Sequence, residues 1–170
     1  MPYVFLDFEA SSLSKQSYPI EVGWVHEDGS GEAHLIRPAT GWTDWDASAE
    51  AIHHISRPML DAEGEPHDLV WAKMQPLFAT NIVVASAPSW DGHWLSMLLR
   101  AAGQPRHLHR LQDTEVAFLD AVRKRTTNES EGQDMIAAAR AKFDSQPAGH
   151  RAEADARREW SIWRTIVEGS

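Results

Sequence analysis

Residues 3–13, which read Tyr-Val-Phe-Leu-Asp-Phe-Glu-Ala-Ser-Ser-Leu, constrain the fold of this chain more than any other stretch. They begin as an apolar run of β-prone residues and then place two carboxylates, Asp7 and Glu9, at alternate positions. In a strand such side chains share one face, roughly 6.7 Å apart along the backbone. Two acids near the end of a buried strand repel each other, and a divalent cation between them removes that penalty. We therefore predict half of a metal site; the alternative is a half-exposed strand with acidic outward positions.

Length and composition indicate a soluble globular chain and exclude several classes of protein. The 170 residues are 42% hydrophobic and 24% charged, which predicts one domain, residues 1–170, with a real core. No apolar run approaches the ~18–20 residues that span a bilayer. The absence of cysteine excludes disulfides and thiolate chemistry and favours a cytoplasmic location. A net charge of -9 argues against general adhesion to nucleic acid, although bound metal would make an acidic cluster locally less negative.

The periodicity of apolar residues predicts a mixed-sheet α/β domain. An antiparallel meander comes first, followed by alternating helices and strands. The predicted strands are residues 3–8, 20–26, 32–37, 81–87 and 107–112. The predicted helices are residues 47–52, 66–79, 91–102, 114–124, 135–143 and 150–167, with turns or loops at Pro58, at 126–132 and at Pro147.

Three other places carry residues suited to chemistry. Asp91 follows the buried strand 81–87, where it is either a functional acid or a helix N-cap. His150 and Asp155 are five residues apart, which is ~140° of rotation on an ideal helix, so they converge only if His150 precedes the helix. The alternative for this pair is an ordinary exposed helix start. His53 and His54 are adjacent and point in different directions, so at most one of them faces a cleft.

Taken in order, these residues resemble the motifs of the DEDDh exonucleases. That branch of the ribonuclease H-like superfamily includes proofreading exonucleases, ribonuclease T and oligoribonuclease. Asp7 and Glu9 match its first motif, Asp91 its second, and His150 with Asp155 its third. The stretch from Ile52 to Ile55 also resembles an apolar-His-x-apolar element seen between the first two motifs. The resemblance implies a mixed five-strand sheet flanked by helices.

The resemblance also implies an activity: 3′-5′ exonucleolytic hydrolysis of single-stranded RNA or DNA, releasing 5′-mononucleotides. It implies that four acids hold two Mg²⁺ or Mn²⁺ ions, which prefer oxygen ligands, namely Asp7, Glu9, Asp91 and Asp155. One ion would activate a water and the other would stabilise the leaving 3′ oxygen. His150 would be the general base. Small members of the family suggest a homodimer.

Substrate binding is where this chain departs from the family pattern. The usual Thr-containing, Gly-ending run after the first acids is replaced by Ala10, Ser11, Ser12 and Leu13. A serine hydroxyl or backbone N–H of this run would contact the terminal nucleotide, and Leu13 would wedge against a base. The asparagine often found shortly before the second-motif acid is absent here. His53 and Trp90 are the other predicted substrate contacts, Trp90 because an aromatic ring stacks on bases.

Several alternatives stay open at this stage. The basic residues in 106–110, in 123–125 and at Arg151, Arg157 and Arg158 would neutralise phosphates or simply form solvated helix faces. Most acids on the last helix, Glu153 and Glu159 among them, are expected to be solvated. A metal-dependent hydrolase of a small nucleotide or phosphoester is the nearest rival function. A catalytically silent nucleic-acid-binding module is another, but it would not need all five motif residues.

Overall fold

The computed structural model describes residues 1–145 and 149–169. A five-stranded sheet has the order β3-β2-β1-β4-β5. The first strand, β1, is antiparallel to β2 and parallel to β4, and β5 is parallel to β4. The strands are β1 (Tyr3–Ala10), β2 (Pro19–His26), β3 (Gly31–Leu35), β4 (Ile82–Ala85) and β5 (Gln112–Asp113). This mixed sheet confirms the predicted fold class.

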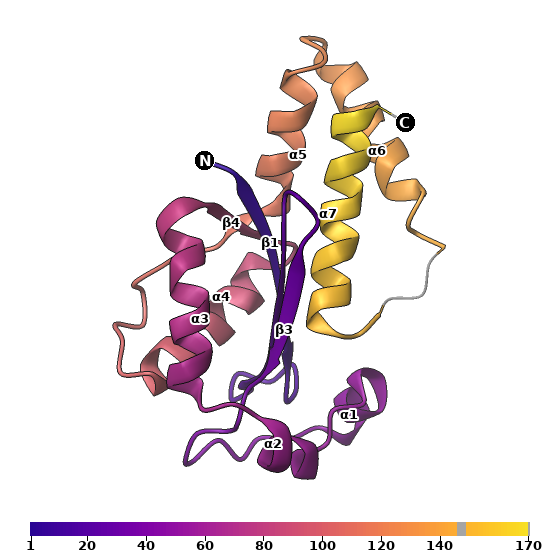
Figure 1. Cartoon of the computed structure of the whole chain (residues 1–170). Coiled ribbons are helices and arrows are strands. Elements are labelled where there is room, and N and C mark those ends of the chain that lie inside the picture. The colour runs from indigo at the N-terminus through magenta and orange to yellow at the C-terminus, as the bar shows by residue number, and fades with distance from the viewer. Residues whose placement is uncertain (146–148, 170) are drawn as a thin grey trace.

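Within residues 1–145 and 149–169, seven helices flank the sheet, on both of its faces (Figure 1). They are α1 (Ala47–His53), α2 (Arg57–Glu63), α3 (His67–Thr80), α4 (Pro88–Ala101), α5 (Thr114–Arg123), α6 (Glu129–Ala141) and α7 (Ala152–Glu168). In Figure 1, α3 and α4 lie to one side of β1 and α7 to the other, with α1 and α2 below.

The alternation of side chains along β1 divides the core into two layers. Val4, Leu6 and Phe8 point into a cluster with α3 and α4. Tyr3 and Phe5 point into the opposite cluster, which α5, α6 and α7 cover. Because side chains two apart share a face, the next odd positions, Asp7 and Glu9, also belong to the α7 side of the sheet.

Parallel pairing of β1 with β4 brings the carboxyl ends of these two strands to one edge of the sheet. The α4 helix begins at Pro88, shortly after β4 ends at Ala85. The fixed φ of proline suits the first turn of a helix. This short connection places the first turn of α4 beside the end of β1, and Asp91 lies in that turn.

Three predicted boundaries were wrong. Residues 57–63 form α2, because the Ser56 side chain caps a helix that starts just before Pro58. Residues 129–132, predicted as loop, belong to α6, whose N-terminus is capped by Asn128. The predicted strand 107–112 is reduced to Gln112–Asp113, since only those residues pair with β4. Pro147, predicted to interrupt the chain before the last helix, lies outside the described residues.

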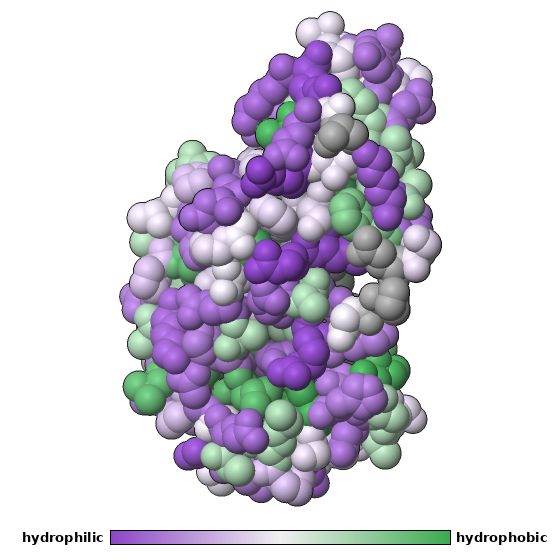
Figure 2. Space-filling view, turned by 45° about the vertical axis from the view of Figure 1, so that its right-hand side comes forward, coloured by the Kyte–Doolittle hydropathy of each residue, from purple (hydrophilic) through white to green (hydrophobic). Residues whose placement is uncertain are grey.

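In the part of the chain that the structure describes, no helix is long and apolar enough to cross a membrane. Figure 2 shows a predominantly hydrophilic face, with a small group of hydrophobic residues at the level of α1 and α2.

Candidate active site

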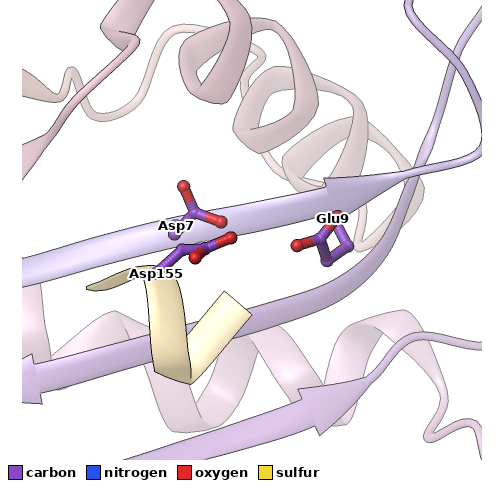
Figure 3. A group of neighbouring side chains, drawn as sticks. All are labelled: Asp7, Glu9 and Asp155. Carbon is purple, nitrogen blue, oxygen red and sulfur yellow. The ribbon is translucent and has the colours of Figure 1, made fainter. Parts of the chain in front are cut away.

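Three carboxylates from two elements converge on the α7 side of the sheet. Asp7 and Glu9 project from β1, and Asp155 projects toward both from the first turn of α7 (Figure 3). One oxygen from each of the three carboxylates lies within 4.8 Å of the other two. Hard divalent cations take carboxylate ligands from such a set.

A glycine on β2 lets α7 approach the sheet this closely. Gly23 pairs with Asp7 in the β1–β2 ladder. A Cβ atom on Gly23 would lie 2.2 Å from the backbone N of Glu153 and 2.5 Å from the carbonyl carbon of Ala152. Only glycine is compatible with that contact, and the contact places the first turn of α7 directly over Asp7 and Glu9.

Asp91 is not one of the three acids that lie within 4.8 Å of one another, but its charge acts on Asp7, and it is not a helix N-cap. Ala87 is the N-cap of α4. The Oδ1 atom of Asp91 instead accepts a hydrogen bond from the backbone N–H of Phe8, at 3.2 Å. Asp91 is 1% exposed, and its Oδ2 atom has no hydrogen-bond partner among the described residues. A buried carboxylate oxygen without a partner is costly, and a bound cation would satisfy it.

Burial raises the pKa of each of these acids, and repulsion by neighbouring carboxylates raises those of Asp7 and Glu9 further. Burial, followed by the charges of Asp91 and Glu9, raises the pKa of Asp7 well above its usual range. Burial, followed by the charge of Asp155, raises the pKa of Glu9 to about 7. Burial also raises the pKa of Asp91 to about 7, although the hydrogen bond from the Phe8 backbone acts to lower it. The pKa of Asp155 rises for the same reason, and hydrogen bonds from the Gly149 and His150 backbones oppose the rise.

These four acids fit a divalent-cation site. Four carboxylates whose charges repel one another, and one buried oxygen without a partner, are the features that a cation would stabilise. The donor set is oxygen only, which suits Mg²⁺ or Mn²⁺ better than metals that prefer nitrogen or sulfur ligands.

His150 lies at the edge of this cluster. It is exposed and precedes α7, whose N-cap is Arg151, so it is off the helix as its spacing from Asp155 requires. Its backbone φ is 45°, a left-handed conformation that is uncommon for residues other than glycine. His150 is therefore accessible to solvent, one residue before the N-cap of the helix that carries Asp155.

The serines after β1 are engaged with an acid that the sequence analysis overlooked. Asp44 accepts hydrogen bonds from the hydroxyls of Ser11 at 3.1 Å, Ser12 at 2.5 Å and Ser14 at 3.0 Å. These hydroxyls, Ser12 foremost, lower the pKa of Asp44. Ser11 and Ser12 are buried, so their hydroxyls organise the loop itself. Leu13 in the same loop is 73% exposed.

The other predicted substrate contacts differ in exposure. Ala10 is buried at the end of β1. His53 is 3% exposed; its Nδ1 accepts from the backbone N–H of Ile55, and its Nε2 has no partner among the described residues. Trp90 is 37% exposed and stacks on Trp94, with ring centroids 5.7 Å apart. Trp94 is buried in the core.

Two further acids lie near the site, and neither was predicted to belong to it. Glu21 on β2 is 1% exposed, faces Glu9 in the strand ladder and binds Arg151. Glu159, expected to be solvated, is largely buried and accepts from the Thr114 hydroxyl at 3.1 Å. Alternation on β2 pointed to Glu21, but its partner lies 130 residues away, so the sequence carried no signal for the pair.

Part of the predicted basic surface is neutralised within the chain. The guanidinium group of Arg157 pairs with Glu153, and that of Arg158 pairs with Asp144. Arg125 donates to the carbonyl of Ile166 at 2.7 Å. These residues stabilise helix packing, which agrees with the alternative that they are not a phosphate-binding surface.

Comparison with known proteins yields matches only at the level of structure. No family model and no curated protein matches the sequence. The chain is similar to E. coli exonuclease I in its zinc-bound complex with single-stranded DNA, with a TM-score of 0.69 and 16% identity over 99% of this chain. It is also similar to apo exonuclease I (TM-score 0.68, 16% identity, 99% of this chain) and to the complex with a dT13 oligonucleotide (0.67, 16%, 99%). It spans 40 to 42% of the length of those chains. At this identity the likeness shows a shared fold.

Proposed function

We propose that this chain is a metal-dependent 3′-5′ exonuclease of the DEDDh type, with residues 1–170 as one exonuclease domain. The observation that carries the proposal is the convergence of three carboxylates from β1 and α7 within 4.8 Å. The unpartnered Oδ2 atom of Asp91 at the end of the same strand supports it. The likeness to exonuclease I complexes with single-stranded DNA makes a single strand the proposed substrate.

In this proposal the four acids hold Mg²⁺ or Mn²⁺ and His150 moves the proton. When bound, divalent cations activate a water and stabilise the charge that develops on the phosphodiester. His150 takes the proton of that water, a role that suits an exposed imidazole on the segment before α7. Leu13 and Trp90 present apolar surface to the terminal nucleotide.

The experiment uses 5′-labelled single-stranded RNA and DNA oligonucleotides, with Mg²⁺, with Mn²⁺ and with chelator. We expect a metal-dependent ladder that shortens from the 3′ end and disappears in chelator. The relative rates on RNA and DNA decide which sugar the site prefers. No shortening of either strand, with Asp7→Ala indistinguishable from the wild type, would overturn the proposal.

A second function, hydrolysis of a small nucleotide or phosphoester, uses the same acids. Internal pairing of Arg157 and Arg158, together with a net charge of -9, favours it over a chain that grips long strands. Cleavage of a mononucleotide ester without shortening of any oligonucleotide would select this function. The homodimer and the cytoplasmic location stay predictions.

A further inference from the structure

An ion pair between a buried carboxylate and a half-exposed guanidinium group joins β2 to the N-terminus of α7, next to the acid cluster. The Glu21 carboxylate accepts from Arg151 Nε at 3.0 and 3.1 Å and from Nη2 at 2.5 Å. It also accepts from the backbone N–H of Ala152 at 3.0 Å. The side chain of Glu21 is 1% exposed, whereas that of Arg151 is 45% exposed. We call these three groups the Glu21–Arg151 anchor.

The anchor supplies the cap that α7 does not provide for itself. Arg151 is the N-cap residue, but its side chain makes no capping hydrogen bond. The Glu21 carboxylate satisfies the first helical N–H from outside the helix, and its negative charge lies at the positive end of the helix dipole. Two strand positions further, Gly23 touches the backbone of the same turn. The start of α7 is therefore fixed to β2 at two successive positions of one strand face.

The anchor lies between the two functional groups of the α7 segment, His150 and Asp155. His150 directly precedes Arg151 and has the left-handed φ of 45°. The backbone N–H of Asp155 donates to the carbonyl of Arg151 at 3.0 Å, so Asp155 lies one helical turn beyond the anchor. Glu21 itself faces Glu9 across the β1–β2 ladder. One buried carboxylate thus sets the distance between the acids of β1 and both functional groups of the α7 segment.

We infer that Glu21 and Arg151 are positioning residues, which hold His150 and Asp155 in register with Asp7 and Glu9. The inference rests on the proposed function. The competing role for Arg151 is direct binding of a substrate phosphate. Bidentate pairing with Glu21 already uses its Nε and one Nη, which favours positioning.

Arg151→Ala and Glu21→Gln test the inference, with Arg157→Ala as the matched control. Arg157 also pairs with a glutamate on α7 and has similar exposure, 39% against 45% for Arg151, but its partner Glu153 is in the same helix. It also donates to the Gly29 carbonyl at 3.1 Å, so the control removes a contact between α7 and the turn after β2 that does not involve Glu21. We expect both anchor variants to lower kcat on a labelled oligonucleotide roughly 10- to 100-fold, because displacing catalytic groups by about 1 Å has that effect. KM should stay within about twofold, since the groups that bind substrate are untouched.

Hydrogen exchange provides a readout that does not depend on activity. Amides of residues 152–158 should exchange about tenfold faster or more in both anchor variants, while those of residues 162–168 stay at the wild-type rate. The control Arg157→Ala should leave kcat, and the exchange rates of both regions, close to the wild-type values. Glu21→Gln is the safer variant to fold, because it keeps the size of the side chain and an acceptor for the Ala152 N–H, whereas Arg151→Ala leaves a buried carboxylate without its counter-ion.

The outcomes separate this inference from the proposed function. Unchanged exchange at 152–158 overturns the inference whether or not the wild type is a nuclease. Faster exchange throughout α7 also overturns it, because the pair would then stabilise the whole fold. A raised KM with unchanged kcat in Arg151→Ala would make Arg151 a substrate ligand instead. A wild-type protein that shortens no oligonucleotide removes the proposed function, and the exchange rates still decide whether the anchor fixes α7.

Discussion

Burial and the carboxylates around it raise the pKa of Asp7, and in the proposed function a bound cation would offset that repulsion. In metal-free protein, Glu9 and Asp91 have a pKa of about 7, whereas both acids titrate near 4 in an unfolded chain. Between these values the folded state binds more protons than the unfolded state, so stability falls as pH rises through that range.

The first prediction at the scale of residues is a pH-dependent stability that metal reverses. In chelator, the free energy of unfolding should be lower at pH 8 than at pH 5, by roughly 1–3 kcal/mol. Mn²⁺ should stabilise the protein more at pH 8, because the ligands are then ionised. Chemical denaturation at the two pH values measures both effects, with Asp7→Asn as the control that weakens them. Equal stability at both pH values in chelator, with no response to Mn²⁺, would contradict the assignment of the acids.

The second residue-scale prediction concerns His150. His150→Asn should lower kcat roughly 10²- to 10⁴-fold, the usual contribution of a general base. Initial rates on a labelled oligonucleotide at neutral pH, at saturating Mg²⁺ for both proteins, measure the loss. A variant that keeps the full rate at neutral pH would remove His150 from the mechanism.

At the scale of elements, the contact between α7 and β2 assembles the site. Gly23→Ala would place a Cβ 2.2 Å from the backbone of Glu153, which forces the helix away from the sheet. We expect a loss of stability of roughly 1–3 kcal/mol or more and a large loss of activity. Gly92→Ala is the control for stability, since its Cβ meets open space in α4 and should stabilise the helix by about 0.5–1 kcal/mol. Equal unfolding midpoints for Gly23→Ala and the wild type would show that the contact does not constrain α7.

The sequence predicted the central strands but not every helix start or strand length. Alternation in residues 3–8 and 20–26 and the apolar run at 81–87 identified the central strands, because burial on a pleated sheet leaves a period of two. The start of α6 was missed although Asn128, with Glu131 three residues later, is a helix-start signal. The shortness of β5 depends on its pairing with β4, which local sequence does not encode.

The sequence predicted those site residues that belong to motifs occurring in a fixed order along the chain. Asp7, Glu9 and Asp155 were predicted together and lie together. Glu21, Gly23 and Asp44 were not predicted, because each acts through a contact with a segment distant in the chain. Hydroxyl ligands for the nucleotide were expected at Ser11 and Ser12, and only the structure shows that both donate to Asp44.

At the scale of the whole molecule, the central claim is that β1, α4 and α7 together form one divalent-cation site. The most direct measurement is titration of metal-free protein with Mn²⁺ at pH 8, followed by electron paramagnetic resonance of the free ion. We predict saturable binding to the wild type, weakened roughly tenfold or more in Asp155→Asn and unchanged in Glu153→Gln, two residues earlier on the same helix. Equal affinity in the wild type and Asp155→Asn, or no saturable binding to either, would contradict the claim.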